Sequence, residues 1–473
     1  MSTAILWFRN DLRLADNPAL QALLRGDFTA LPVYVHAPGE EGAWAPGAAS
    51  DAWRRRSLQA LDAQLRALGS RLHVFTGPTL DTLARVAQAS GAQAVFWNRR
   101  YEPAIEARDA VVKRALRSQG LRAESHDAAL LFEPWQVQTR QGDPYRVFTP
   151  FWRTALSQWR LPPESEAPRR LPAPAPTSAL DEVELDLILP SPAPRWDAGF
   201  WSHWTPGEGG AREAMTEFAT QRTADYALAR DRPAVQGTSR LSPHLHFGEI
   251  SPWRIVRALE SSPAAEREAF VRELGWREFA HHVLHHFPHT PEANFNPRFD
   301  DFPWAEVPPA HLDAWRHGHT GVPLVDAGMR ELWHTGWMHN RVRMVVASFL
   351  VKNLRGHWRH GARWFWDTLV DADLANNTLG WQWAAGTGVD ASPYVRVFNP
   401  TLQAQRFDPQ GEYIARWLPG FERLPAALRH EPWRDPAAVA AVAPDYPRQP
   451  VVDLARSRQD ALEAFARSRA LRT

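Results

Sequence analysis

Four short segments of the chain combine ionisable, hydroxyl and aromatic side chains at spacings that could do chemistry. In the first, residues 237–243 (GTSRLSP), hydroxyl groups and Arg240 precede a helix start, with Ser242 as the expected N-cap and Pro243 as the first helical residue. Backbone N–H groups at such a start favour an anion such as a phosphate. The pattern alone is weak evidence, because capped helices that bind nothing are more common.

Two further segments place polar and aromatic groups on one face of an expected helix. Glu273, Trp276 and Arg277 stand at i, i+3 and i+4, so a carboxylate, an indole and a guanidinium lie side by side. A surface ion pair beside a half-buried ring has the same spacing, so this cluster needs support from elsewhere. The second of these segments places a large ring, an amide and a thioether on one helix face, as the wall of a ligand cavity could: Trp337, Asn340 and Met344.

The fourth segment, residues 371–383 (DADLANNTLGWQW), ends in two closely spaced tryptophans. Trp381 and Trp383 are two positions apart and point in roughly opposite directions, so one can face the interior and the other a cavity. The chain has 23 tryptophans but only 7 tyrosines, and ordinary core filling does not explain why the tryptophans cluster in these segments.

Composition excludes several kinds of chemistry. The chain has no cysteine, which removes disulfides, iron–sulfur clusters, thiolate zinc sites and cysteine nucleophiles. Two i,i+4 histidine pairs could hold zinc, but the glutamate of a zinc-protease motif is missing, so we expect a solvated helix and no metal: His281, His282, His285 and His286. Any redox chemistry must therefore use a cofactor or aromatic side chains.

Length and charge indicate a two-domain protein without a membrane span. A chain of 473 residues exceeds one usual core, and no apolar run reaches the roughly 18 residues of a span. The start resembles no secretory signal, so we expect a cytoplasmic protein. The net charge is only +1, but residues 321–367 carry seven basic and three acidic side chains, which favours a local nucleic-acid contact.

Residues 1–130 alternate β-rich and helical patterns, which predicts an α/β domain with a doubly wound parallel sheet. The expected strands are residues 4–9, 31–37, 71–77 and 92–98, and the expected helices are residues 18–25, 51–68, 79–90 and 105–118. The first strand-to-helix turn, Arg9-Asn10-Asp11, has no glycine fingerprint for a dinucleotide. We expect a linker over 131–205, proline-rich at 161–195, and an all-α domain over 206–473.

Taken together and in this order, the segments closely resemble the photolyase/cryptochrome family. The resemblance runs through nearly the whole chain: WFRNDLRLADNPAL, GTSRLSPHLHFGEISP, WREF, TGVPLVDAGMRELWHTGWMHNRVRM, DADLANNTLGWQW and VFNPTLQAQRFDPQGEYIARWLPGF. Within the family, the sequence is most similar to the branch that includes class III bacterial photolyases and plant cryptochromes.

The resemblance implies an α/β antenna domain and a helical domain that binds FAD. By position in the family's motifs, the cofactor-binding residues are Tyr226, Thr238, Ser239, Arg240, Leu241, Ser242, Phe270, Arg277, Trp337, Arg343, Asp371, Ala372, Asp373 and Asn377. Arg343 and Asp371 are expected to form a charge-assisted pair. Asn377 aligns opposite the flavin N5, where an amide suits a photolyase that works from the reduced anionic flavin and the similar plant cryptochromes carry an aspartate.

The implied activity is light-driven repair of cyclobutane pyrimidine dimers in ultraviolet-damaged DNA, after the dimer has left the duplex. The residues implied at the catalytic site are Glu273, Asn340, Met344, Trp276, Trp383 and Asn377, and those implied at DNA are Glu273, Trp276, Arg277, Asn340, Arg341 and Arg396. A chain of indoles for re-reducing the flavin is implied at Trp381, Trp358 and Trp304.

Some alternatives stay open on the sequence. A cryptochrome-type light sensor would keep the fold and the flavin without repair. The antenna is expected to be 5,10-methenyltetrahydrofolate, with Glu102 at a pterin-contacting position, although a deazaflavin is an alternative. We expect a monomer in a bacterial cytoplasm, with access to chromosomal DNA.

Overall fold

The computed structural model describes residues 2–174 and 180–470 of the chain. Contacts divide the chain into two compact units. Unit 1 comprises Met1–Tyr145, Thr149–Thr223 and Ser239–Pro288, and unit 2 comprises Arg146–Phe148, Ala224–Thr238 and His289–Thr473. Residues 206–223 and 239–288, which we expected in the helical domain, therefore fall in the same unit as the sheet. The predicted boundaries at 130 and 205 stay predictions.

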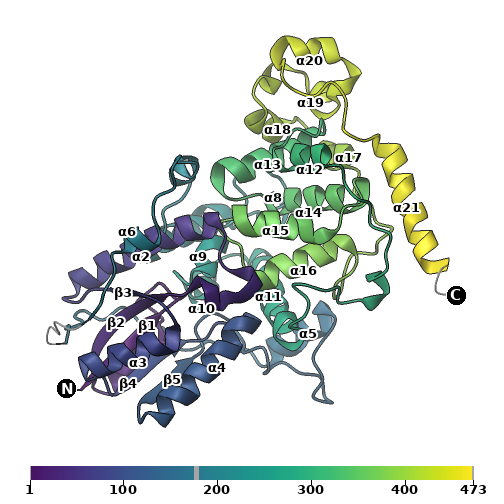
Figure 1. The fold of residues 1–473 in the computed structure, drawn as a ribbon. Coiled ribbons are helices and arrows are strands. Elements are labelled where there is room, and N and C mark those ends of the chain that lie inside the picture. The colour runs from purple at the N-terminus through teal and green to yellow at the C-terminus, as the bar shows by residue number, and fades with distance from the viewer. Residues whose placement is uncertain (1, 175–179, 471–473) are drawn as a thin grey trace. The chain divides into compact units, whose positions relative to one another are not determined.

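Unit 1 contains a five-stranded, fully parallel sheet in the order β3-β2-β1-β4-β5 (Figure 1). The strands are β1 Thr3–Phe8, β2 Thr29–His36, β3 His73–Thr76, β4 Ala94–Asn98 and β5 Arg122–His126. On β1, Ile5 and Trp7 pack in one apolar cluster with α3 and α4, and the alternate residues Ala4, Leu6 and Phe8 are buried as well. Because both faces are covered, the prediction of a doubly wound sheet is confirmed.

The helices between the strands are α1 Pro18–Arg25, α2 Ala48–Ala67, α3 Thr79–Ser90 and α4 Pro103–Ser118, with a 3-10 turn η1 at Pro38–Trp44. Helix α1 begins where predicted because the Asn17 side chain accepts a hydrogen bond from the Leu20 N–H and Pro18 fits the first turn. Helix α3 ends at Gly91, whose φ of +65° is the left-handed conformation that glycine adopts without strain.

Side chains of the chain itself fill the turn after β1. The Asp11 carboxylate accepts hydrogen bonds from the Arg9 backbone N–H and from Asn98 Nδ2, both at 2.6 Å. The same Asn98 amide donates to Asn17 Oδ1 at 2.8 Å. This turn is closed by carboxylate and amide groups, in agreement with the missing glycine fingerprint.

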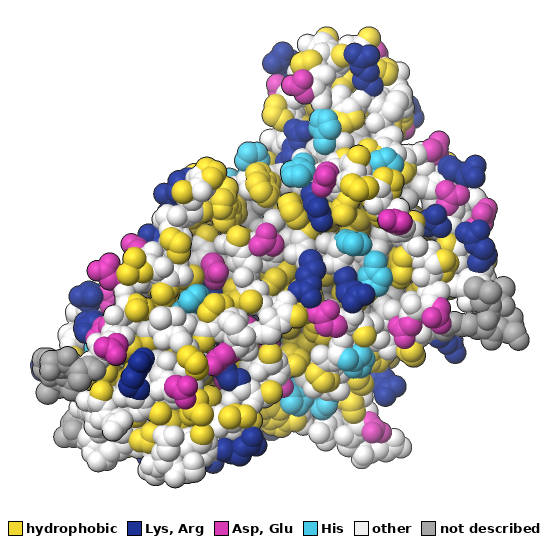
Figure 2. Space-filling view, viewed as in Figure 1, with side chains coloured by type: hydrophobic (Ala, Val, Ile, Leu, Met, Phe, Trp, Pro, Cys, Tyr) yellow, Lys and Arg dark blue, Asp and Glu magenta, His cyan; other side chains and the backbone are white. Residues whose placement is uncertain are grey.

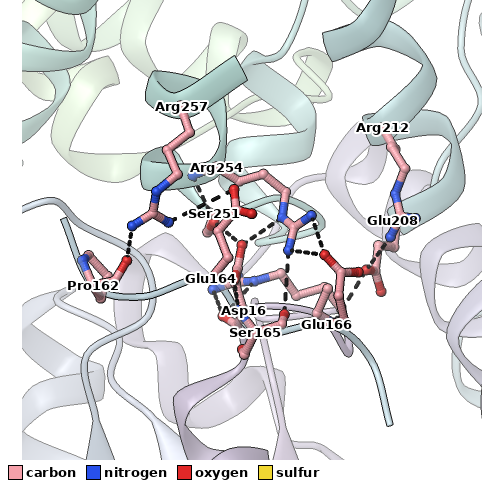
Figure 3. A network of polar contacts seen from close by, with 12 residues as sticks. Asp16, Pro162, Glu164, Ser165, Glu166, Glu208, Arg212, Ser251, Arg254 and Arg257 are labelled. Atoms are coloured by element: carbon pink, nitrogen blue, oxygen red, sulfur yellow. Dashed lines mark hydrogen bonds and ion pairs between the residues drawn. The ribbon is translucent and has the colours of Figure 1, made fainter. Parts of the chain in front are cut away.

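The proline-rich segment is held against the rest of unit 1 at its beginning (Figure 3). Asp16 and Ser165 exchange hydrogen bonds: the Asp16 N–H donates to the Ser165 carbonyl at 2.8 Å, and the Ser165 N–H donates to Asp16 Oδ1 at 2.9 Å. The other oxygen, Oδ2, accepts from Ser251 Oγ at 2.9 Å and from Arg254 Nε at 2.7 Å. Asp16 therefore joins the linker to α10, Pro252–Ala258.

The remaining helical elements that lie mostly or wholly in unit 1 are α5 Phe148–Ser157, α6 Leu185–Ile188, η2 Ala198–Ser202, α7 Glu208–Glu217, η3 Phe218–Arg222, α9 Ser242–His246 and α11 Ala264–His286. Helix α11 carries the four histidines, and the expectation that they are solvated is wrong for two of them, because His281 and His282 are buried. Burial lowers the pKa of His282 to about 4. His285 also has a carboxylate partner, Glu106, with 3.0 Å between Nδ1 and Oε1.

Unit 2 is helical. Its elements are α8 Tyr226–Ala229, η4 Pro297–Phe299, α12 Pro309–Arg316, α13 Pro323–Thr335, α14 Asn340–Ser348, η5 Phe349–Asn353, α15 Trp358–Thr368, α16 Leu374–Ala385, α17 Pro400–Phe407, α18 Glu412–Trp417, η6 Phe421–Arg423, α19 Ala426–His430, η7 Pro432–Arg434, α20 Pro436–Val442 and α21 Leu454–Ala470. Among the residues that the structure describes, no helix is long and apolar enough to cross a membrane. The described residues also contain no group of three or more His, Cys, Asp or Glu that could hold a metal ion.

The basic segment 321–367 does not form one charged surface. Lys352 is buried, its Nζ donates to the Ala385 carbonyl at 3.1 Å, and burial lowers its pKa. Arg363 is paired with Glu292 at 2.7 Å. On the face shown in Figure 2, basic and acidic side chains are interspersed. The excess of basic residues in this segment is therefore not by itself evidence of a nucleic-acid contact.

We expect Asp16→Asn to destabilise the protein by about 2 kcal/mol at neutral pH, because the hydrogen bond from Arg254 loses its charged acceptor. Burial alone would raise the pKa of Asp16, but hydrogen bonds with Arg254, Ser165 and Ser251 lower it below its ordinary value. The difference between parent and variant in urea unfolding should be complete above about pH 4 and disappear as the pH falls through the folded pKa.

The matched control is Asp186→Asn, which removes the charge from a solvent-exposed pair with Arg55. It should change the free energy of unfolding by less than about 1 kcal/mol. Equal effects of the two substitutions would contradict the role given to Asp16.

Candidate cofactor and DNA site

In unit 1, the predicted side chains on α11 are half-buried and lie one turn apart: Glu273, Trp276 and Arg277. Arg277 Nη1 donates to the Ala129 carbonyl at 2.8 Å and lies 3.3 Å from Glu278 Oε1. Glu278 is buried, and burial raises its pKa. Arg277 is therefore anchored to the loop after β5, while Glu273 and Trp276 lie one turn before it.

The same helix is packed closely on α5. A Cβ on Gly275 would lie 2.8 Å from the ring of Trp152, which is shorter than any ordinary carbon contact. Phe270 is buried with its ring centroid 4.8 Å from that of Phe218. These apolar contacts fix the rotation of α11 and hence the direction in which Glu273 and Trp276 project.

The hydroxyl-rich turn before α9 differs in one detail from the prediction. Helix α9 begins at Ser242 with Leu241 as its N-cap, so the predicted N-cap, Ser242, is wrong by one position. Ser239 Oγ accepts a hydrogen bond from the Leu241 N–H at 3.3 Å, which closes the turn. Arg240 has a φ of +56°, and its guanidinium lies 4.2 Å from the ring centroid of Trp204.

In unit 2, the expected pair of Arg343 and Asp371 is confirmed. Arg343 Nη2 lies 2.8 Å from Oδ2 and 3.1 Å from Oδ1 of Asp371, and its Nε donates to the Met338 carbonyl at 2.7 Å. The guanidinium is also 5.8 Å from the ring centroid of Trp337. Such a charge-assisted pair holds both side chains in place before any ligand binds.

The turn before α16 places the next predicted residues. Asp373 is the N-cap of α16, with its Oδ1 accepting from the Asn376 N–H at 2.8 Å, and Ala372 is buried beside it. Asn377 is half-buried, and its Nδ2 donates to the Ala362 carbonyl of α15 at 3.0 Å. This bond joins α16 to α15.

The predicted indoles gather around α15. Trp381 is buried against α15, where a Cβ on Gly361 would lie only 1.9 Å from its Cη2 atom. Trp358 begins α15 one turn earlier and is fully buried. The His357 ring is close to both Trp358 and Trp304, with ring-centroid distances of 5.5 and 5.3 Å.

His357 is uncharged at neutral pH. Burial, followed by the charges of Arg359 and His360, lowers its pKa to about 4. Its Nδ1 accepts a hydrogen bond from the Arg359 N–H at 3.2 Å and caps α15. A neutral ring is therefore close to both Trp358 and Trp304, and Trp304 is half-buried.

Two of the residues predicted to contact DNA, Asn340 and Arg341, begin α14. Asn340 is exposed and Met344 half-buried on this helix. Arg341 pairs with Asp231, at 2.8 Å between Nη2 and Oδ1, and its guanidinium lies 4.3 Å from the ring centroid of Phe407. Asp231 was not found from the sequence, because 110 positions separate it from Arg341 and no local pattern connects them.

Two other predicted residues, Trp383 and Arg396, both lie near one phenylalanine ring. The Trp383 ring stacks on Phe398 with centroids 6.4 Å apart, and the Arg396 guanidinium lies 5.7 Å from the same Phe398 ring. Tyr226 is buried in α8, with the Arg230 guanidinium 5.6 Å from its ring. Thr238 is half-buried at the end of its segment of unit 2.

Glu102, the predicted antenna residue, lies at the carboxyl end of β4 in an ionic cluster. Arg100 Nη2 donates to Glu102 Oε1 at 2.7 Å and to Glu41 Oε2 at 3.0 Å. Burial alone would raise the pKa of Glu41, but Arg100 and Arg54 lower it to about 2. The cluster is charged and compact.

Each unit carries side-chain types that bind an anionic cofactor with phosphate groups. Hydroxyl and guanidinium groups gather in the turn from Thr238 to Ser242, and Arg343 stays partly exposed beside its carboxylate partner, with side-chain exposures of 23% and 5% for Arg343 and Asp371. Asn377 adds an amide whose N–H is fixed by a backbone carbonyl. These are the residue types that orient phosphates and a polar heteroaromatic ring.

Two family models match the chain. One, described as "DNA photolyase", matches residues 4–175, and the other, described as "FAD binding domain of DNA photolyase", matches residues 270–467. A deoxyribodipyrimidine photo-lyase of Agrobacterium fabrum is 42% identical over 98% of this chain and 97% of its own. Cryptochrome-2 of Arabidopsis thaliana is 38% identical over 98% of this chain and 79% of its own.

A solved structure gives the same result. The crystal structure of a bacterial class III photolyase from Agrobacterium tumefaciens has a TM-score of 0.94 and 41% identity, and the match covers 99% of this chain and 98% of that one. The chain therefore belongs to the DNA photolyase family, in which plant cryptochromes are also close relatives.

We expect Gly361→Ala to lower the free energy of unfolding by about 1–3 kcal/mol, because the new methyl group displaces the Trp381 ring. Gly380→Ala is the matched control on α16, since Gly380 is exposed with no atom within 4 Å of its added Cβ. That substitution should stabilise the protein by about 0.5–1 kcal/mol. Urea denaturation measures both, and a stabilising Gly361→Ala would contradict the contact.

Proposed function

We propose that this protein repairs cyclobutane pyrimidine dimers in ultraviolet-damaged DNA under blue light, with FAD as its cofactor. The observation that carries the proposal is the similarity to DNA photolyases over almost the entire chain. Trp383 and Met344 support repair over light sensing, because they supply the apolar walls that a dimer needs. Asn377 supports it too, since its amide cannot give up a proton.

FAD in its reduced anionic form supplies, when excited, the electron that splits the dimer and receives it back. Tyr226 and the turn from Thr238 to Ser242 would bind its phosphates and ribityl chain. The Arg343–Asp371 pair would orient the polar edge of the ring system, and Asn377 would face N5. Phe270, Trp337, Ala372, Asp373 and Arg277 would complete the site.

The extruded dimer would be held by polar groups at its edge and rings at its faces. Glu273 and Asn340 would hydrogen-bond its carbonyl groups, while Trp276, Trp383 and Met344 exclude water, with stacking worth about 1–3 kcal/mol per ring. Arg341 and Arg396 would contact phosphates. Arg341 must exchange Asp231 for a phosphate, so its net contribution to affinity is the difference between the two pairs.

The antenna in this proposal is 5,10-methenyltetrahydrofolate, with Glu102 as a pterin contact. A carboxylate held by Arg100 is a fixed acceptor for the N–H groups of a pterin. Absorbance and chromatography of the cofactor released from purified protein test this point. Release of a deazaflavin would show that the antenna is a deazaflavin and not a folate. Glu102→Ala should lower the folate content without lowering the FAD content.

The direct test mixes the FAD-loaded protein with irradiated oligothymidine under blue light and follows absorbance in the thymine band. Recovery of absorbance means repair, and bound flavin without recovery means a cryptochrome-type sensor. Glu273→Ala should lower the repair rate on the order of 10²-fold, since a preorganised hydrogen-bonding group that stabilises the charged dimer is lost. Glu268→Ala, exposed on the same helix, is the control and should repair at the parental rate.

Trp358→Phe should abolish light-driven reduction of the oxidised cofactor, because phenylalanine is much harder to oxidise than tryptophan. Repair by protein whose cofactor was reduced chemically should survive, since the indole chain only refills the cofactor. Absorbance of the flavin under blue light with an external thiol measures the first effect. Equal photoreduction in parent and variant would refute the indole chain.

Asn377→Asp should slow light-driven formation of the fully reduced anionic cofactor. The introduced carboxyl group would face the Ala362 carbonyl, which lies 3.0 Å from Asn377 Nδ2, and two oxygens at that distance favour the protonated acid. A proton donor would then replace a neutral amide. An unchanged reduction course would show that Asn377 does not face N5.

A further inference from the structure

The neutral side chain of Asn294 accepts a hydrogen bond from the indole N–H of Trp358, the middle tryptophan of the predicted chain of indoles. Trp358 Nε1 donates to Asn294 Oδ1 at 2.9 Å, and Asn294 Nδ2 donates in turn to Asp300 Oδ1 at 2.9 Å. Trp358 is fully buried, Asn294 is half-buried and Asp300 is exposed. The three side chains therefore form one hydrogen-bonded line from the buried indole to the surface.

The orientation of the Asn294 amide is set by chemistry. An ionised carboxylate only accepts hydrogen bonds, so Asp300 must face the amide N–H₂ group. An indole N–H only donates, so Trp358 must face the amide oxygen. Both neighbours require the same orientation, and the indole therefore meets a very weak base.

We infer that Asn294 is a positioning residue that keeps the proton on Trp358 while this tryptophan is oxidised, so that the oxidation passes on to Trp304. The inference rests on the electron-relay part of the proposed function. In the relay, Trp381 would give one electron to the photoexcited oxidised cofactor. Trp358 would then reduce the oxidised Trp381, Trp304 would reduce the oxidised Trp358, and a thiol in solution would reduce the oxidised Trp304. Electrons move inward one at a time, and Trp358 gains and loses one without losing a proton.

The group that accepts the hydrogen bond from Trp358 matters because oxidation makes an indole N–H much more acidic. An amide oxygen cannot hold the proton, so the positive charge stays on the ring and Trp358 remains a strong oxidant. A carboxylate in the same place would take the proton and leave a neutral radical, which oxidises Trp304 less readily. The neutral His357 ring, which is close to both Trp358 and Trp304, adds no opposing charge.

The decisive variant exchanges the two side chains, Asn294→Asp together with Asp300→Asn. The exchange keeps the net charge and the hydrogen bond between positions 294 and 300, but it places the carboxylate against the indole. Transient absorption should then report a deprotonated Trp358 radical. Net photoreduction should fall at least about tenfold, which is the equilibrium factor for a carboxylate that binds the indole proton one pKa unit more tightly than the Trp358 radical does.

Two single variants are controls. Asp300→Asn leaves a neutral acceptor at the indole and should retain parental photoreduction. Asn296→Asp makes the same chemical change two positions away, where the Asn296 side chain caps a 3-10 turn by accepting from the Arg298 N–H, a role that aspartate also fills. A loss in Asn296→Asp equal to that in the exchange would overturn the inference, because a new carboxylate near the indoles would then suffice without a hydrogen bond to Trp358.

A readout that needs neither light nor turnover is the ¹⁵N–¹H resonance of the Trp358 indole in the FAD-loaded protein kept in the dark, assigned by its absence in Trp358→Phe. It should report a hydrogen-bonded N–H in the parent and move further downfield in the exchange variant. An indole N–H with the shift of a free group in the parent would contradict the hydrogen bond itself.

The unaltered protein tests the inference even if the exchange variant does not fold. Oxidation should pass from Trp358 to Trp304 at equal rates in H₂O and D₂O, because no proton leaves Trp358. A slower transfer in D₂O, or a deprotonated Trp358 radical in the parent, would overturn the role of Asn294 while the relay stands. Normal photoreduction in Trp358→Phe would instead remove the relay and this inference with it.

Discussion

The close approach of α15 and α16 is the contact on which the candidate site in unit 2 depends. Because residue 361 has no side chain, the Trp381 ring lies directly against the backbone of α15. The next carbonyl, that of Ala362, is then within hydrogen-bonding distance of Asn377. One small residue thus places both an oxidisable ring and the amide assigned to the flavin, and the N-terminal end of the same helix holds Trp358.

Charged groups of the candidate site are already paired within the protein. Arg343 is held by Asp371, Arg341 by Asp231, and Arg277 by Glu278 and a carbonyl oxygen. Desolvating an unpaired guanidinium would cost several kcal/mol, so these pairs make a dry site possible. They also hold the side chains in place, which reduces the ordering that a ligand must impose.

Much of the fold could be predicted because local chemistry determines it. Asn17 and Pro18 mark the start of α1, and Gly91 marks the end of α3. The strand β5 was missed, because Arg122–His126 consists mostly of polar residues and pairs only with its buried neighbour β4.

Long-range packing accounts for the other misses. The burial of His281 and His282 was also missed, since it comes from packing such as that of the His282 ring on Phe151, 131 positions earlier in the chain. The Arg343–Asp371 pair was predicted from the resemblance to a family, not from a local pattern. The functions of the individual site residues stay predictions.

The burial of the indoles has a consequence for the energetics of the proposed relay. Trp381 and Trp358 are almost or fully inaccessible to water, whereas Trp304 is only half-buried. Around a buried ring few dipoles can turn when its charge changes, so the reorganisation energy of the first transfers is low. At Trp304 water can turn toward the new charge and stabilise it. The gradient from dry to wet surroundings therefore gives the electron flow a direction even though all three carriers are the same amino acid.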